Sequence, residues 1–450
     1  MKTILLMLFA LSFYSCKKNS TTVDQADKAP ALSVGNTTMS SFAAAVTTVT
    51  KNDPADNSKN VQALIKSNVT LYFPKATYKF TNFVSIKNIN NLKIYAEPGT
   101  VFVTNQNKII EIYGTTSDID ISFITFQSTK VSAIEDTEGL IFVANYGIND
   151  IMNTIAIHDC SFSNPNTLCD AIKVVSEGVN AVAKNIVINN NTFKSIGRFG
   201  VELQNNLYVP MIARITNYNI TNNKFEDVGT IQKGPASSCV SLTGYSLNGV
   251  VNNNYFLNMR MNTTGSVYYG IENAGAVNLQ TNGNTFTSNT YGFTGILGSG
   301  PTPAESSLRN QPQKSMWYIE NNTFNLTGSA TDKTKIRAID LADTHAYFIE
   351  NNTMKTDGQN ARFTNCYDGI ISGNIMQSST SGSVLYFQSS SIKNKVTGNT
   401  ITAKGGGDTG TVFFEGQSVN NNYAYSNTLY KATGKAGDYR NWNGAYNNFW

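Results

Sequence analysis

A short pattern of apolar and polar positions recurs along the chain. An apolar residue is followed by four mostly polar residues rich in Asn, and then by a large apolar residue. Clear copies lie at 188–193 (INNNTF), 220–225, 251–256, 281–286, 319–324, 349–354, 371–376 and 396–401, with degenerate copies at 121–126 and 157–162. Successive copies start 22 to 38 residues apart, mostly near 30. An internal period of this length predicts stacked repeats within one domain.

The segments between the copies predict short strands. They show no helical period, and segments such as 171–175 and 200–204 alternate between apolar and polar side chains. A chain wound with several short strands per turn stacks each coil about 4.8 Å above the last. Asn suits the corners of such coils, because it tolerates left-handed backbone and its amide can bond the Asn above and below.

The beginning of the repeat region resembles the first coils of a known fold. Residues 69–78 (VTLYFPKATY), 86–91 and 92–101 are similar to the opening of right-handed parallel β-helix proteins of the pectate-lyase-like superfamily, and the resemblance covers residues 65–430. It implies an all-β, single-stranded right-handed parallel β-helix with roughly ten or more coils. The same fold carries lyases, hydrolases, epimerases, adhesins and phage spikes, so it does not by itself set the activity.

Composition agrees with a solenoid and excludes several other classes. Lys plus Arg is 34 and Asp plus Glu is 30, so 14% of 450 residues are charged, against about 25% in an ordinary soluble domain. In a stacked column like charges repel whereas amides bond, which explains the replacement of charge by Asn. The net charge of +4 indicates no nucleic-acid partner. Two histidines, His158 and His345, exclude a His-rich metal centre.

The N-terminus has the features of a targeting signal. Residues 1–3 (MKT) form a short n-region with the basic Lys2, residues 4–13 form an apolar run, and Cys16 follows shortly after it. This resembles a bacterial lipoprotein signal in which Cys16 is lipidated; a plain secretory signal is the alternative. Residues 1–16 are therefore expected to be the signal and 17–38 a flexible tether. A lipid anchor in the outer membrane, on its periplasmic face or at the cell surface places the protein in the cell envelope.

Residues 39–450 are expected to form the β-helix with closed ends. A short helix in 39–51 would cap the first coil, whose strand edges would otherwise be open to pairing, and the aromatic-rich segment 430–450 would close the last coil. An oxidising compartment also permits a disulfide between Cys160 and Cys169.

Alternation along five strands predicts a column of outward side chains. Aligning 171–174, 200–203, 239–242, 270–273 and 338–341 makes the second residue of each point inward and the third outward. The outward residues are Lys173, Glu202, Ser241, Glu272 and Asp340, with Thr294 between the last two. Arg198 and Arg337 would reach the column from the preceding corner, Tyr268 and Tyr269 lie near Glu272, and His345 near Asp340 and Asp343. The long coil at 298–315 would form the wall of a groove.

These residue types suit an acidic sugar polymer. Glu202, Glu272, Asp340 and Lys173 are the predicted catalytic residues, and Arg198, Arg337, Tyr268, Tyr269 and His345 the predicted substrate-binding residues. Arginine neutralises a uronate carboxylate, a Lys or Tyr removes the adjacent proton, and two acids can serve as a hydrolytic pair. The alternative is that the column is a solvated wall in which Lys173 and Glu202 form a cross-strand ion pair. Either way, we expect the acids to be exposed and their amide variants to cost less than about 0.5 kcal/mol.

Two subfamily comparisons leave the chemistry open. Asp170 to Val174 and Gly197 to Glu202 resemble the second and third catalytic coils of polygalacturonase-like glycoside hydrolases. That family has an acidic pair where Cys169 and Asp170 stand, and a histidine between glycines where Arg198 and Phe199 stand. Metal-dependent lyases need neighbouring acids, yet Glu202 and Glu272 are two coils, about 9.6 Å, apart. No cofactor or metal ligand is assigned, and calcium stays open.

The sequence therefore predicts an envelope-anchored protein that binds and processes a polysaccharide, acting like a lyase on a glycan that contains uronic acids. One alternative is a non-catalytic glycan-capture or adhesin-type lipoprotein. The other is a polygalacturonase-like glycoside hydrolase. Whether the chain is an enzyme at all stays open, and lyase and hydrolase are the two classes considered.

Overall fold

The computed structural model describes most of the predicted β-helix. The described residues are 46–50, 54–132, 134, 138–205, 212–231, 236–258, 267–289, 292–300, 314–328, 336–379, 382–404, 411–416, 419–431, 438–442 and 447–449. All of them belong to the compact unit Thr37–Trp450. The predicted signal, Cys16 and the tether lie outside them. Within the described ranges, no helix combines the length and the apolarity needed to cross a membrane.

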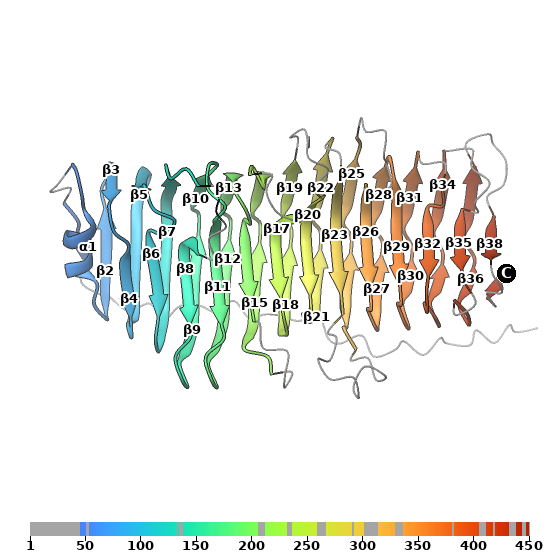
Figure 1. Ribbon diagram of the computed structural model, residues 1–450, viewed down its shortest axis with the longest axis horizontal. Helices are drawn as coiled ribbons and strands as arrows, with labels where there is room; N and C mark the ends of the chain where they lie inside the picture. The colour runs from blue at the N-terminus through green and yellow to red at the C-terminus, as the bar shows by residue number, and fades with distance from the viewer. Residues whose placement is uncertain are drawn as a thin grey trace, which may run out of the picture. The chain divides into compact units, whose positions relative to one another are not determined.

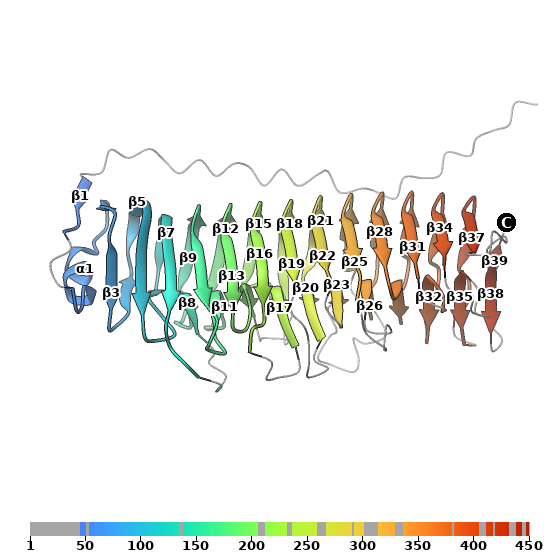
Figure 2. The same ribbon diagram turned by 90° about the horizontal axis from the view of Figure 1, so that it is seen from above.

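The chain winds through three strands per coil, and the strands of successive coils pair in parallel (Figures 1 and 2). Two of the three strands belong to sheet A, which has 26 strands, and the third belongs to sheet B, which has 13. Sheet B thus counts thirteen coils in the described part of the chain. This confirms the predicted parallel β-helix; its connections follow the right-handed rule for parallel crossovers.

The first flank of sheet A begins with β1 and β2. Its strands are β1 (Val46–Thr48), β2 (Val69–Phe73), β5 (Asn90–Thr104), β7 (Thr116–Ser128), β9 (Ile151–His158), β12 (Val182–Asn189), β15 (Ile215–Thr221), β18 (Ser246–Asn252), β21 (Val277–Asn282), β24 (Trp317–Glu320), β27 (Tyr347–Glu350), β30 (Ile370–Ser372), β33 (Lys395–Thr397), β36 (Tyr423–Tyr425) and β39 (Asn448–Phe449).

The second flank of sheet A includes the far halves of β5 and β7, which continue around the corner. Its other strands are β3 (Thr77–Phe80), β10 (Ser161–Asn164), β13 (Thr192–Ile196), β16 (Lys224–Val228), β19 (Tyr255–Asn258), β22 (Thr285–Ser288), β25 (Thr323–Leu326), β28 (Thr353–Thr356), β31 (Ile375–Ser378), β34 (Thr400–Ala403) and β37 (Thr428–Lys431).

Sheet B carries the candidate site. Its strands are β4 (Val84–Lys87), β6 (Ile110–Tyr113), β8 (Gly139–Asn145), β11 (Asp170–Ser176), β14 (Val201–Gln204), β17 (Ala236–Thr243), β20 (Val267–Ala274), β23 (Phe293–Ser299), β26 (Arg337–Ala342), β29 (Gln359–Thr364), β32 (Leu385–Gln388), β35 (Val412–Glu415) and β38 (Tyr439–Trp442).

The repeated Asn motif forms the corner between the two flanks of sheet A. Its third position adopts left-handed backbone, with φ of 54° at Asn190 and 57° at Asn222, and glycine replaces Asn there at Gly283. Its fourth position is buried and forms a ladder in which each side-chain amide donates to the next Asn Oδ1 at 2.9–3.1 Å. The ladder runs through Asn191, Asn223, Asn254, Asn284, Asn322, Asn352, Asn374, Asn399 and Asn427. The expected amide bonding between coils is confirmed.

The last position of the motif stacks in the core. Phe rings from successive coils lie with centroids 4.6–5.2 Å apart and nearly parallel planes, from Phe126 through Phe162, Phe193, Phe225, Phe256 and Phe286 to Phe324. All of these rings are buried. The sequence repeat is therefore the repeat of the core, and it fixes how each strand of sheet B is placed relative to its neighbours.

The N-terminal end differs from the prediction. Val46 to Thr48 form a strand that pairs with β2, not part of a helix in 39–51. The one helix in the described residues, α1, spans Ser58–Leu64 and buries Val61. These residues form a strand because β2 has an open edge with which they pair. At the other end, β38 and β39 add strands to the last coil, and Phe449 stacks on Phe414 at 5.5 Å.

Candidate functional site

One outward column runs the length of sheet B, and we call it the central column. Register pairing lines up Ser85, Glu111, Phe142, Lys173, Glu202, Ser241, Glu272, Leu297, Asp340, Arg362, Tyr386, Phe413 and Arg440. The predicted alignment of Lys173, Glu202, Ser241, Glu272 and Asp340 matches this register. The position of Thr294 was wrong, since Leu297 pairs with both Glu272 and Asp340.

The error at Thr294 has a structural cause. Thr294 pairs with Tyr269 and Arg337, three residues before the central column. Two successive positions between these columns both point inward: an added Cβ at Gly270 or Gly295 would meet a Phe ring of the core at 2.6–2.7 Å. The strands therefore do not alternate strictly, and Tyr269, Thr294 and Arg337 form a second outward row.

We call Asp170, Lys173, Arg198 and Glu202 the ionic cluster; they lie on β11, on β14 and in the turn between β13 and β14. Lys173 Nζ lies 2.6 Å from Glu202 Oε2. One Arg198 nitrogen donates to Glu202 at 3.1 Å and to both Asp170 oxygens at 3.1 Å. The Arg198 guanidinium also covers the ring of Phe199 at 4.1 Å. The segments resembling the second and third catalytic coils of glycoside hydrolases thus meet in one cluster.

The ionic cluster is buried. Asp170 is 0% exposed, Lys173 2% and Glu202 4%. The expectation of exposed acids was wrong at Glu202, and also at Asp340, which is 6% exposed. An outward side chain on a parallel sheet is covered by its neighbours in the coils above and below, and here Arg198 lies over them. The expected cost of the amide variants, less than about 0.5 kcal/mol of stability, assumed exposed acids and so does not apply to Glu202 and Asp340.

The two carboxyls of the ionic cluster differ in proton affinity. Burial, and then the charge of Glu202, raises the pKa of Asp170 well above its ordinary value. Burial acts on Glu202 too, but the charges of Lys173 and Arg198 outweigh it and hold the pKa of Glu202 below its ordinary value. One carboxyl can therefore keep a proton at a pH where the other is ionised, which is the condition for an acid–base pair.

Glu272 occupies a milder environment two coils further on. It is half-buried, and its Oε2 accepts hydrogen bonds from Ser238 at 2.8 Å and Ser241 at 3.1 Å. Tyr269 stands beside it in the second row, and burial followed by the charge of Glu272 raises the pKa of Tyr269. Tyr268 is 3% exposed and belongs to the core. Tyr268 was predicted to bind substrate, and its burial at an inward position of β20 opposes that role.

We use the name arginine pair for Arg337 and Arg362 together with Asp340, the carboxylate that both contact. Arg362 donates two hydrogen bonds to Asp340, at 2.9 and 2.8 Å, and Arg337 donates one at 3.2 Å. The side chain of Arg362 is 32% exposed. Asp340 thus holds two guanidiniums, one of them partly exposed. Tyr386 follows Arg362 in the central column and stacks on Phe413 at 5.5 Å.

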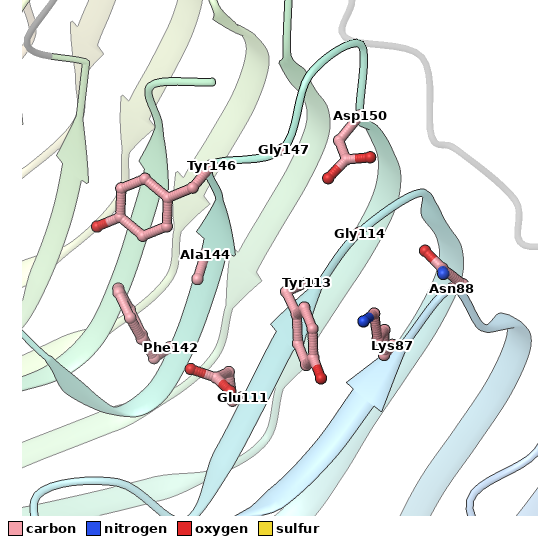
Figure 3. A pocket seen from close by; sticks show the side chains of 10 residues that line it. All are labelled: Lys87, Asn88, Glu111, Tyr113, Gly114, Phe142, Ala144, Tyr146, Gly147 and Asp150. Atoms are coloured by element: carbon pink, nitrogen blue, oxygen red, sulfur yellow. The ribbon is translucent and has the colours of Figure 1, made fainter. Parts of the chain in front are cut away.

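A groove of about 560 Å³ opens at the N-terminal end of the same face (Figure 3). We call it the aromatic groove. Its lining comes from β4, β6, β8 and the turns that follow them: Lys87, Asn88, Glu111, Tyr113, Gly114, Phe142, Ala144, Tyr146, Gly147 and Asp150. The sequence alignment missed it by starting at 171. Residues 110–113 (IEIY) alternate as 172–175 do, so the signal was present.

Lys108 forms one edge of the aromatic groove. Its Nζ lies 2.8 Å from Glu111 and 2.6 Å from Glu138, and 5.3 Å from the centre of the Phe142 ring. Burial disfavours its charge, but the hydrogen bonds to Glu111 and Glu138 prevail and raise the pKa of Lys108. A smaller hollow of about 270 Å³ borders the same lysine and Glu138. Lys108 therefore separates two hollows on this face.

The histidines and cysteines lie away from the central column. His345 lies between β26 and β27 and contacts Asp368 at 2.7 Å. His158, on sheet A, lies between Asp120 at 2.9 Å and Asp159 at 2.6 Å. The cysteines of the described residues form no disulfide and are buried, Cys160 and Cys169 included. Among the described residues, no three His, Cys, Asp or Glu side chains are grouped so as to hold a metal ion. Residues 301–313 of the expected groove wall lie outside the described residues.

Comparison with known proteins finds similarity in structure alone. No protein-family model matches the chain. No curated protein matches it. A similar solved structure is the catalytic unit of a thermostable GH87 α-1,3-glucanase from Streptomyces thermodiastaticus strain HF3-3, with 12% identity, a TM-score of 0.50, and coverage of 90% of this chain and 69% of that one.

Two further structures have lower scores. PfbA, a surface adhesin of Streptococcus pneumoniae, has 14% identity and a TM-score of 0.48 over 86% of this chain and 91% of its own. The A-module of the mannuronan C-5 epimerase AlgE4 from Azotobacter vinelandii has 12% identity and a TM-score of 0.47 over 87% and 95%. At these identities the similarity shows the fold alone: this chain is a parallel β-helix, and polysaccharide-active enzymes and an adhesin are among the proteins similar to it.

Proposed function

We propose that the outward face of sheet B binds an extracellular polysaccharide that contains uronic acids. The observation that carries the proposal is the central column itself. It presents charged, hydroxyl and aromatic side chains in one line across thirteen strands, at a repeat of about 4.8 Å. A polymer offers similar groups at repeated intervals along its length, whereas a small ligand is usually enclosed in one deep pocket.

The arginine pair supports an acidic sugar. Guanidinium groups bind carboxylates with two parallel hydrogen bonds, as Arg362 does with Asp340. The exposed part of Arg362 gives the carboxylate of a ligand access to this guanidinium. The neighbouring Tyr386 ring provides a flat surface on which the apolar face of a sugar can pack.

Processing of the bound chain is the second part of the proposal, and the ionic cluster is where it would occur. Hydrolysis uses two carboxyls, and Asp170 and Glu202 are two carboxyls bound by one Arg198 nitrogen at 3.1 Å each, so a glycan would have to displace Arg198 to reach them. Lyase-like chemistry needs a free base. Lys173 is buried and paired with Glu202 at 2.6 Å, so the pairing opposes that role for Lys173.

An envelope location would complete this function. A chain anchored through Cys16 could hold glycan close to the cell, either for cleavage or as an adhesin-type capture protein. Both activities use the same face of sheet B, and they differ in the products that they leave.

A polysaccharide panel tests the proposal. The protein is passed over immobilised polygalacturonate, alginate, xylan, mannan and glucan, with and without chelator. We expect retention on an acidic polymer, and Arg362→Gln should weaken it about tenfold, a loss of roughly 1.4 kcal/mol. Lys194→Gln is the control, because Lys194 also pairs with a carboxylate, at 2.8 Å, but on sheet A.

The products distinguish the activities. New reducing ends alone indicate hydrolysis, new ultraviolet-absorbing unsaturated ends indicate a lyase, and retention without products indicates capture. Absence of retention on either acidic polymer, or equal retention by Arg362→Gln and Lys194→Gln, contradicts the proposed function.

A further inference from the structure

The aromatic groove is remote from the arginine pair. The strands β6 and β29 are separated by eight steps in the order of sheet B, which is about 38 Å at roughly 4.8 Å per step. A ligand held at one site does not touch the other unless it is a polymer. The chemistry of the groove can therefore be considered by itself.

Three aromatic side chains line the aromatic groove. Tyr146 is 52% exposed, and its ring meets that of Phe142 at 6.4 Å in an edge-to-face contact. Tyr113 is half-buried on the neighbouring strand. Ala144, which pairs with Tyr113 in the register, is small and leaves the space between the rings open. Figure 3 shows the rings of Tyr113 and Tyr146 on different sides of this space.

Carboxylates outnumber cations in this lining. Glu111 and Asp150 supply two acids, and Lys87 supplies one ammonium, which lies 5.1 Å above the Tyr113 ring. At the edge, Lys108 and Glu138 add one charge of each sign, and Lys108 pairs with both Glu111 and Glu138. Asp150 approaches the backbone of Gly147 closely: an added Cβ on Gly147 would lie 1.9 Å from its Oδ2. Glycine at 147 thus allows the carboxylate to turn toward the groove, as Figure 3 shows.

We propose that the aromatic groove binds a neutral sugar unit. Its apolar face packs on Tyr113 or Tyr146, and its hydroxyls donate hydrogen bonds to Glu111 and Asp150. A uronate in the same place would face these two carboxylates, which repel its own. The groove is therefore a second carbohydrate site whose charge preference is opposite to that of the arginine pair, and a glycan that fills both contains acidic and neutral sugars.

Calorimetric titration of the whole chain tests this site. The probes are the hexasaccharides of cellulose, xylan, mannan and amylose, together with trigalacturonate. We expect at least one neutral hexasaccharide to bind, and Tyr146→Ala to weaken it about three- to tenfold, as loss of one ring contact implies. Tyr430→Ala is the matched control, since Tyr430 is 50% exposed but lies on sheet A.

A second variant tests the charge preference. Asp150→Asn keeps the size of the side chain and removes one repelling charge, so we expect the affinity for trigalacturonate to rise at the groove while that for the neutral probe falls. Arg362→Gln should leave binding of the neutral probe unchanged, which separates this site from the proposed function. Failure of all four neutral probes to bind, or equal binding by Tyr146→Ala and Tyr430→Ala, overturns the proposal.

Discussion

The ionic cluster and the arginine pair use the same residue types on the same face of sheet B, yet their charges are balanced differently. In the ionic cluster two cations meet two carboxyls, and the four side chains are 0–14% exposed. In the arginine pair two cations meet one carboxylate, and one guanidinium is 32% exposed. A buried, paired charge can reach a ligand only if its partner moves, whereas the partly exposed guanidinium of Arg362 can reach one directly.

This difference separates two roles that the sequence pattern treats alike. Glu202 and Asp340 are both outward acids in the central column. Glu202 shares its site with a second carboxyl and so can take part in proton transfer. Asp340 holds two guanidiniums in place and so positions groups that can meet a ligand. The following predictions test that separation, beginning with the largest expected effect.

Removing one member of the ionic cluster should be strongly destabilising. Lys173→Met leaves Glu202 buried with Arg198 alone, and the free energy of unfolding should fall by about 3 kcal/mol, since breaking a buried pair costs roughly 3–5 kcal/mol. Hydrogen exchange of the β11 and β14 amides measures this locally, as a solenoid can open coil by coil. The double variant Lys173→Met, Glu202→Met should regain most of the loss. Unchanged exchange in the single variant would mean that the cluster is open to water.

Removing the acid of the arginine pair should cost less. Asp340→Asn leaves two guanidiniums close together without their anion, but Arg362 is partly in water and screened. We expect a loss of about 1 kcal/mol in the free energy of unfolding, seen as faster exchange at β26 and β29. A loss as large as that of Lys173→Met contradicts the distinction between the two regions.

The raised pKa of Asp170 in the ionic cluster should make the stability of the protein depend on pH. A carboxyl whose pKa is raised on folding stabilises the protein fully below its ordinary pKa, about 3.9 for Asp, and this contribution is lost as the pH rises through the raised pKa of Asp170. The thermal midpoint should therefore decline with pH over that interval. Asp170→Asn removes the titrating group, so its midpoint should decline less. If the thermal midpoints of the two proteins decline equally with pH, the titrating group is not Asp170.

The smallest effect on stability is expected at the most exposed member. Arg362→Gln removes one of the two cations of Asp340 and leaves Arg337, so the free energy of unfolding should change by less than about 0.5 kcal/mol. The same variant should lose affinity for acidic polysaccharide, and the remaining affinity should depend less on salt. A stability loss comparable to that of Asp340→Asn would make Arg362 a structural residue.

The fold and the alignment of coils could be predicted from the sequence because they depend on local, repeated chemistry. Each Asn motif supplies one corner, one Asn of the amide ladder and one aromatic ring of the core. Asn191 and Phe193 thus position one coil, and Asn223 and Phe225 position the next. Once these positions are stacked, the pairing of Lys173 with Glu202, and of Ser241 with Glu272, follows.

The exposure and partnership of the outward residues depended on the tertiary structure. Alternation indicates which way a side chain points, but not what covers it. Only the folded chain brings Arg198 over Asp170 and Glu202 and gives Asp340 a second arginine from β29. It also places Tyr268 in the core, because the two successive positions 270 and 271 of β20 both turn inward. The sequence by itself determined the repeat and its register, since identical neighbours stack. The tertiary structure decided which charges are paired and which stay available, because that depends on contacts between residues that no local pattern relates.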